Sequence, residues 1–325
     1  MPVLVFAENW EGKFKKATFE AITYANGVAQ ITGKSVIAIS VGKIQEADLA
    51  GLGNYGVSKV LNVTDERISS NSIQALASVI SEAAKKEAAS VLIFAHTFTG
   101  QSVAPKVSAK LDAGYVAGVT KLPSALEPFK VKRKVFSGKA FADVEVRKKI
   151  CVLTVFPNSH GIKETGGKAT VEVLNVSVPE KDFSCKSIKV SKASTKLSVT
   201  EATIVVSAGR GLKGPENWKM IEELAGLLGA ATACSKPVSD AGWRPHEEHV
   251  GQTGKTIGPN LYIAIGISGA IQHLAGVNSS KVIVVINKDP EAPFFKAADY
   301  GIVGDAFQII PKLIESVKNF KEVTV

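Results

Sequence analysis

The chain has 325 residues, of which 45% are apolar and 21% charged, and this composition excludes a disordered or collagen-like chain. Its length favours two domains, and an aromatic content of only 7% indicates an aliphatic core of the α/β class. The net charge of +9 lies wholly in the first 195 residues, which hold 26 Lys and Arg against 17 Asp and Glu. No nucleic-acid-binding motif accompanies this charge, so we expect no nucleic-acid partner.

The first half of the chain alternates strand-like and helix-like segments. Apolar runs predict buried strands at residues 3–7, 35–41, 59–63 and 90–95, and apolar residues at helical spacing predict helices at 15–30 and 71–86. Repeated strand–helix–strand units produce a parallel sheet that is covered on both faces. We therefore expect an α/β domain here.

The sequence pattern changes after about residue 117. Residues 130–136, 144–155 and 169–178 alternate apolar and polar side chains and lack helical spacing. We interpret them as an antiparallel extension that closes a first domain at residues 1–190. Two basic clusters in this region, 130–134 and 147–149, fit solvated strand faces better than a site for an anionic partner.

A Lys- and Ser-rich segment at residues 179–198 is the predicted link to a second domain at residues 196–325. Its predicted strands are 203–207, 230–234, 261–265, 281–286 and 300–303, and its predicted helices are 215–228, 270–275 and 307–320. This order predicts a mainly parallel, Rossmann-like sheet flanked by helices. Such a sheet binds ligands at the carboxyl ends of its strands.

The first loop at that edge carries a GxGxxG sequence at residues 209–214, between a predicted strand and a predicted helix. A nicotinamide-binding fold also needs an acidic residue about 20 positions further on, and residues 234–236 read Cys-Ser-Lys instead. An ordinary nicotinamide site is therefore not expected. Arg210 suits a diphosphate, and the alternative is a tight turn with Arg210 exposed.

The second loop joins a predicted strand to a predicted helix at residues 266–273. Free backbone N–H groups and the helix dipole predict an anion site there, with Ser268 either a plain N-cap or a cap that also touches phosphate. His273 falls in the first helical turns, where the dipole would lower its pKa and leave a neutral donor beside a ligand. The alternative is a structural histidine.

Two further loops complete this edge. The glycine-rich loop at residues 236–261 is long enough to indicate a binding loop, and its His246-Glu-Glu-His249 run lacks the HExxH spacing, so we expect no metal. Asn287 ends a predicted strand, where its amide suits a ribose or a ring edge. Asp305 precedes the last helix and is the predicted N-cap.

Other features restrict the function. The longest apolar runs are strand-sized and no targeting presequence is present, so we expect a cytoplasmic protein without direct membrane insertion. The three cysteines lack CxxC spacing, so we expect neither structural disulfides nor a cysteine zinc site. No nucleophile–base pattern is present, which favours a nucleotide-cofactor carrier over an enzyme.

Four segments closely resemble the α subunit of electron transfer flavoproteins. They are Ser207-Ala-Gly-Arg-Gly211, Val250-Gly-Gln-Thr-Gly-Lys255, the run 261–276, which includes Gly-Ile-Ser-Gly-Ala-Ile-Gln-His, and Ile286-Asn-Lys-Asp-Pro-Glu-Ala-Pro293 followed by Ala298-Asp-Tyr-Gly301. The resemblance covers residues 200–320 in order and spacing. The first domain agrees in size and βαβ character.

The resemblance implies a heterodimer with a β subunit, with AMP as a candidate nucleotide in that subunit, and FAD on the second domain of this chain. It also implies electron flow from acyl-CoA dehydrogenases to a membrane-bound quinone oxidoreductase in fatty acid β-oxidation. The residues implied in FAD contact are Arg210, Ser235, Lys236, Val250, Gly251, Gln252, Thr253, Gly254, Ser268, Gly269, Ala270, Ile271, Gln272, His273, Asn287, Asp305 and Ala306.

By the same resemblance, Thr253 lies near the flavin N5, and His273 donates near the O2 edge and favours an anionic semiquinone. Lys236 stands where the family commonly has an Arg stacked over the ring, and Lys lacks that planar fork. Two alternatives remain. One is an electron-bifurcating complex fed by NADH, with a second FAD in the β subunit. The other is a nicotinamide-dependent enzyme, against which the missing ribose acid counts.

Overall fold

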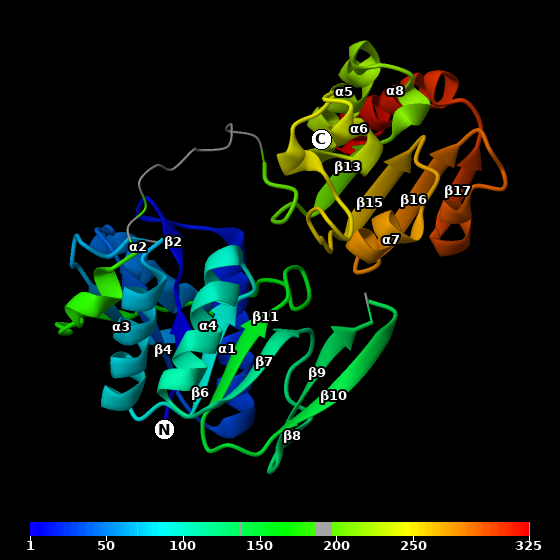
Figure 1. Ribbon diagram of the computed structural model, residues 1–325. Helices are drawn as coiled ribbons and strands as arrows, with labels where there is room; N and C mark the ends of the chain where they lie inside the picture. The colour runs from blue at the N-terminus through cyan, green and yellow to red at the C-terminus, as the bar shows by residue number, and fades with distance from the viewer. Residues whose placement is uncertain (70, 137, 186, 188–196, 325) are drawn as a thin grey trace. The chain divides into compact units, whose positions relative to one another are not determined.

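The computed structural model describes residues 1–324 except 70, 137, 186 and 188–196. The chain divides into two compact units (Figure 1). Unit 1 is Met1–Val135 with Ala140–Ser191, and unit 2 is Phe136–Lys139 with Lys192–Val325. The predicted domain boundary at residues 190–196 lies outside the described residues.

Unit 1 is built on one mixed sheet with the strand order β10-β9-β7-β11-β6-β1-β4-β5-β12, in which β8 also pairs with β9. The strands are β1 (Val3–Phe6), β4 (Val36–Val41), β5 (Val57–Val63), β6 (Val91–Ala95), β7 (Gly114–Val119), β8 (Ala125–Leu126), β9 (Phe129–Val135), β10 (Ala140–Val146), β11 (Cys151–Val155) and β12 (Thr170–Val173). A small hairpin of β2 (Asn9–Trp10) and β3 (Lys13–Phe14) follows β1.

Helices cover both faces of this sheet because its central strands are buried on both sides. Helix α1 (Lys16–Thr32) contributes its buried side chains to the core on one face. Helices α3 (Ile73–Lys86) and α4 (Phe98–Lys110) contribute theirs to the core on the other face. A short helix, α2 (Glu46–Gly51), and a 3-10 turn, Leu52–Tyr55, lie between β4 and β5. The predicted α/β class is confirmed.

Part of the predicted antiparallel extension is wrong. Among the described strands of this extension, only β7–β9, β8–β9 and β9–β10 pair antiparallel, whereas β11 is a buried parallel strand between β6 and β7, and β12 pairs parallel with β5. The run 144–155 is two strands, not one. Alternation of apolar and polar residues reports exposure of a strand face but not strand direction, so the pattern carried no information on this point.

The sheet of unit 2 is wholly parallel, with the order β14-β13-β15-β16-β17. The strands are β13 (Ile204–Ala208), β14 (Ala231–Cys234), β15 (Leu261–Ile265), β16 (Val282–Asn287) and β17 (Tyr300–Val303), and the helices are α5 (Lys219–Leu228), α6 (Lys236–Asp240), α7 (Ile271–Val277) and α8 (Ala306–Thr324). Helix α5 is preceded by a 3-10 turn, Pro215–Trp218, within the segment predicted as helix.

The order of these strands sets the place of the site. The chain moves from β13 to β14 in one direction and then returns to β15 on the other side of β13. The loops that leave β13 and β15 therefore separate at the carboxyl edge, and this switch point is where doubly wound sheets bind ligands. Among the described helices, none is both long and apolar enough to cross a bilayer.

Candidate functional site

Three glycines bring the loops after β13 and β15 into direct backbone contact. The amide of Gly209 donates to the carbonyl of Ile265 at 3.0 Å, and the amide of Gly211 donates to the carbonyl of Gly266 at 3.1 Å. A Cβ on Gly209 would lie 2.4 Å from the carbonyl oxygen of Gly266, and a Cβ on Gly211 would lie 2.7 Å from the Cα of Gly266. These glycines are therefore required by close approach at the switch point.

Hydrogen bonds join the other predicted loops to the same carboxyl edge. The side-chain amide of Asn287 donates to the carbonyl of Ile267 at 3.0 Å, which ties the end of β16 to the loop after β15. The amide of Gln252 donates to the carbonyl of Gln272 at 2.7 Å, which ties the glycine-rich loop to α7. The structure thus brings together the four loops singled out in the sequence.

The segment Val250–Gly254 is ordered by its own glycines. The amide of Val250 donates to the carbonyl of Cys234 at the end of β14. Gly251 has a φ of +151°. A Cβ on Gly276 would lie 2.5 Å from both the Cα and the backbone nitrogen of Gly251. This packing leaves Gln252 and Thr253 exposed, so the side chains of both are accessible to a ligand.

The predicted role of Ser268 as an N-cap is wrong. The N-cap of α7 is Ala270, which makes no side-chain capping bond, and Ser268 is exposed two residues earlier. Gly269 intervenes with a φ of +83°, and a Cβ there would lie 2.5 Å from the Cβ of Phe294. The chain needs this turn to pass Phe294, which shifts the start of the helix. Helix α7 has only 7 residues, so its dipole is a weak basis for an anion site.

His273 is buried at 7% exposure, and its Nε2 lies 2.8 Å from the hydroxyl of Tyr262. Burial, reinforced by the nearby imidazole of His249, lowers the pKa of His273 to about 4. The sequence predicted a lowered pKa for His273, and the structure agrees with that direction. The main cause is desolvation by burial and not the helix dipole. Tyr262 was not predicted as part of the site, since it lies inside an apolar strand and carries no motif.

Four of the remaining candidates lie at the starts of helical segments. Arg210 is exposed on the 3-10 turn that follows β13. Lys236 is the first residue of α6 and forms an ion pair with Asp240 at 2.9 Å. Asp305 accepts a hydrogen bond from the amide of Phe307 at 2.9 Å, which confirms it as the N-cap of α8, and Ala306 is buried at the first position of that helix.

The long loop before β15 is anchored by Arg244, a contact that sequence reasoning missed. Its guanidinium bonds Glu248 at 2.6 Å and Glu222 at 3.0 Å, and it stacks over the ring of Trp218. Thr232 also donates to Glu248. Glu248 is therefore committed to the anchor, and the described part of the chain contains no group of three or more metal-binding side chains.

Comparisons with known proteins identify the family. Residues 3–180 match the electron transfer flavoprotein domain, and residues 198–278 match the electron transfer flavoprotein FAD-binding domain. Electron transfer flavoprotein subunit alpha of Syntrophomonas wolfei is 38% identical over 316 residues, covering 97% of this chain and 98% of the relative. The mitochondrial alpha subunit of Dictyostelium discoideum is 39% identical over 333 residues, covering 98% and 92%. The chain belongs to the electron transfer flavoprotein α-subunit family.

The cofactor of this electron transfer flavoprotein domain is FAD, and the residues of unit 2 fit it. The contact of Gly209 and Gly211 with Gly266 brings the loops after β13 and β15 together at the switch point, where a doubly wound sheet binds a diphosphate, and Gly211 is exposed there. In addition, burial lowers the pKa of His273 and keeps its imidazole neutral at this edge. Close loops at the switch point and a neutral imidazole are compatible with a bound flavin, whose potentials are tuned by neighbouring groups.

Proposed function

We propose that the chain is the FAD-binding α subunit of a heterodimeric electron carrier that takes electrons from acyl-CoA dehydrogenases and delivers them to a membrane-bound quinone oxidoreductase. The observation that carries this proposal is the glycine contact between the loops after β13 and β15, within the segment that matches a FAD-binding domain. Pairing of residues 1–190 with a β subunit, AMP in that subunit, and a cytoplasmic location belong to the same proposal.

The chain's own residues would act mainly by binding and orienting. Arg210, exposed beside the glycine contact, supplies a planar fork of donors that suits the diphosphate. Asn287 keeps the loop after β15 in place through its bond to Ile267. Thr253, exposed on its ordered loop, supplies a hydroxyl for the flavin N5.

Charge near the ring is the second contribution. Bound FAD supplies one- and two-electron transfer, and hydrogen bonds and positive charge around a flavin tune its potentials. We propose that His273 supplies a hydrogen bond and that Lys236 supplies the positive charge. His273 supplies a neutral ring and not a charge, because burial lowers its pKa. Lys236 supplies the positive charge, although its bond to Asp240 shares that charge with a carboxylate. The other proposed contacts are Ser235, Val250, Gly251, Gln252, Gly254, Ser268, Gly269, Ala270, Ile271, Gln272, Asp305 and Ala306.

Co-expression with the β subunit tests the proposal. We expect a stable heterodimer with a flavin absorption spectrum and one FAD, which an acyl-CoA dehydrogenase reduces in the presence of its acyl-CoA substrate and a quinone oxidoreductase reoxidises. Two FAD per heterodimer, with reduction by NADH, would favour the bifurcating alternative. A flavin-free heterodimer, or turnover that depends on a nicotinamide cofactor alone, would contradict the proposal.

A further inference from the structure

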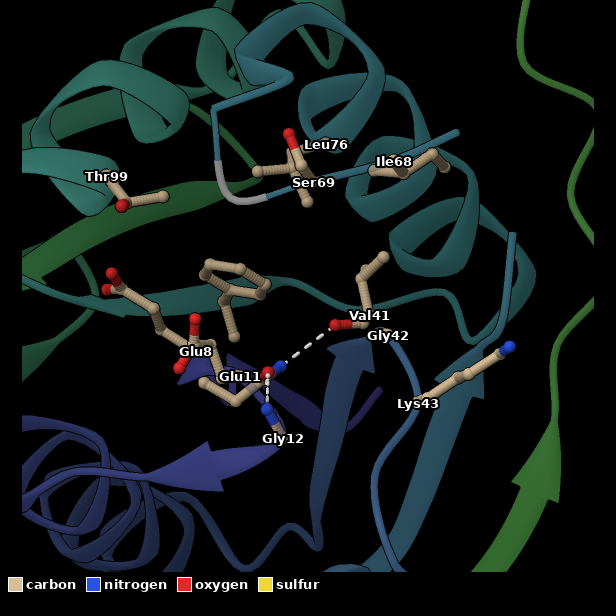
Figure 2. Close-up of a pocket in the computed structure, with 12 residues that line it drawn as sticks. Glu8, Glu11, Gly12, Val41, Gly42, Lys43, Ile68, Ser69, Leu76 and Thr99 are labelled. Carbon is tan, nitrogen blue, oxygen red and sulfur yellow. Dashed lines mark hydrogen bonds between the residues drawn. The ribbon is translucent and has the colours of Figure 1, made fainter. Parts of the chain in front are cut away.

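Unit 1 contains a cavity of about 350 Å³ that the function proposed above does not use. It lies at the carboxyl ends of β1 and β4, beside the first turn of α4 (Figure 2). The strand order of unit 1 also has a switch point, because β1 lies between β4 and β6. The cavity therefore lies where an α/β sheet binds ligands, and its volume falls within the usual range for small-molecule sites.

The rim of the cavity is held in place by Asn9. Its side-chain amide donates to the carbonyl of Val41 at 2.9 Å, and its carbonyl oxygen accepts from the amide of Gly12 at 3.2 Å (Figure 2). A Cβ on Gly12 would lie 2.8 Å from the carbonyl oxygen of Lys43, so only glycine permits the β2–β3 hairpin to approach this loop. These contacts form the rim before any ligand is present.

Glu11 occupies a position that the backbone alone does not favour. Glu11 and Gly12 form the two-residue turn of the hairpin, with φ values of 51° and 78°. Left-handed φ at both positions is the pattern of a type I′ turn, in which Asn, Asp or Gly is preferred at the first position. A glutamate there is conformationally costly, and it places a carboxylate on the wall of the cavity.

The lining is poorly suited to a phosphate. Glu8 and Glu11 both line the cavity, and the loop after β1 has no GxGxxG sequence. Among the described residues that line the cavity, Lys43 is the one cation; it pairs with Glu66, and Figure 2 shows its side chain extending away from the two glutamates. By contrast, Phe6, Val41, Ile68 and Leu76 form an apolar wall. This combination fits a ring that carries hydroxyl or amino groups.

We propose that this cavity binds a nucleoside-sized molecule that has hydroxyl or amino groups and no phosphate. The carboxylates of Glu8 and Glu11 accept hydrogen bonds from these groups, and Ile68 and Leu76 pack against the ring. The side chain of Thr97 donates to the carboxylate of Glu8 and also caps α4, so one oxygen of Glu8 is held in a defined orientation. The site requires neither FAD nor any residue of unit 2.

Calorimetric titration of the FAD-loaded heterodimer with adenosine and with AMP tests the proposal. We expect adenosine to bind without any change in the flavin spectrum, and AMP to bind this cavity at least tenfold more weakly. Hydrogen exchange measured with adenosine, with AMP and with neither should localise adenosine protection to residues 6–12 and 41–43, and it separates AMP bound there from AMP bound to the β subunit. Absence of adenosine binding at millimolar concentration, or AMP binding here as tightly as adenosine, would overturn the proposal.

Two pairs of variants localise the site. Thr99→Trp should block the cavity from α4, whereas Lys106→Trp, exposed on the same helix outside the cavity, should leave adenosine affinity unchanged. Glu11→Asn should weaken adenosine about tenfold, since one charge-assisted hydrogen bond is lost, without lowering the melting temperature, since Asn suits the turn. Unchanged affinity in both Thr99→Trp and Glu11→Asn would show that adenosine binds elsewhere.

Discussion

Both units present the carboxyl edge of a parallel sheet at a switch point, but the two edges differ in chemistry. In unit 2 the first loop carries glycines and Arg210, and the glycines touch the next loop backbone to backbone. In unit 1 the equivalent loop carries Glu8 and Glu11 beside an open cavity. The same topology thus presents a glycine-rich edge with an exposed arginine in one unit and an edge lined by two glutamates in the other. Fold alone does not select a ligand; the residues of the first loop do.

The largest expected effect concerns a feature that the two units share, a histidine whose pKa is lowered: His96 is partly buried and His273 is buried. Burial lowers the pKa of His96 in unit 1 and of His273 in unit 2 to about 4, from 6.5. Arg133 adds to the shift of His96, and His249 to that of His273. Between pH 6.5 and 4 each of these histidines is protonated in the unfolded chain and remains neutral in the folded chain. Stability should therefore fall as the pH falls through this window, by about 3 kcal/mol for each histidine.

Hydrogen exchange resolved by unit, at pH 7 and pH 5, checks this expectation. His96→Gln should flatten the pH dependence of unit 1 only, and His273→Gln that of unit 2 only. If both units kept the full slope in both variants, other groups would be responsible for the acid sensitivity.

The next effect distinguishes the two edges. Gly211→Ala places a Cβ 2.7 Å from the Cα of Gly266, so the loop after β13 must move. We expect a loss of about 1–3 kcal/mol in stability and about a hundredfold in FAD affinity, measured by flavin fluorescence. Gly226→Ala is the matched control, because nothing lies within 4 Å of its added Cβ in α5. That control should stabilise the chain by about 0.5–1 kcal/mol. Equal FAD affinity in the two variants would remove the close-approach argument.

The sequence predicted the fold and edge of unit 2 better than those of unit 1. In unit 2 every predicted strand and helix is present, and Asp305 caps α8 as expected. In unit 1, α4 was missed because its sequence is rich in Thr, Ser and Gly and contains Pro105, and β7 because Gly114 and Gly118 interrupt its apolar pattern. Helix propensity and pattern are weak where tertiary packing decides.

Site prediction failed where a role depends on a distant contact. Arg244 and Glu248 are four residues apart, but their anchoring role depends on Glu222 of α5 and Trp218. Tyr262 belongs to the site only because α7 places His273 against it. Likewise, Gly269 displaced the cap from Ser268 because Phe294 occupies the adjacent space. Such contacts join residues that are distant in the sequence, so no local motif predicts them.

A smaller effect tests a device common to both edges. The side chain of Asn9 donates to the carbonyl of Val41 at the end of β4, and the side chain of Asn287 donates to the carbonyl of Ile267 in the loop after β15. Each side-chain oxygen also accepts a hydrogen bond from a nearby backbone amide. Asn9→Ala and Asn287→Ala should each cost about 1–2 kcal/mol in their own unit, measured by hydrogen exchange. Only Asn287→Ala should weaken FAD, by about tenfold. If Asn9→Ala weakened FAD as much, the cofactor site would not be confined to unit 2.

The smallest expected effect concerns the charge beside the flavin. Lys236 is exposed and shares its charge with Asp240 at 2.9 Å, so much of its influence is screened by solvent. Lys236→Arg keeps the charge and adds a planar group that stacks on aromatic rings. We expect a change of less than about tenfold in affinity for reduced FAD relative to oxidised FAD, in favour of the reduced form, which corresponds to less than about 30 mV for a two-electron couple. Redox titration of the heterodimer measures this shift.

Lys213→Arg is a control that also adds a guanidinium in unit 2, and it should not shift the potential, since that side chain stacks on Phe307. Equal potentials for the Lys236→Arg variant and the parent protein would indicate that position 236 does not contact the ring, and the proposed electrostatic contribution would then rest on other groups at this edge.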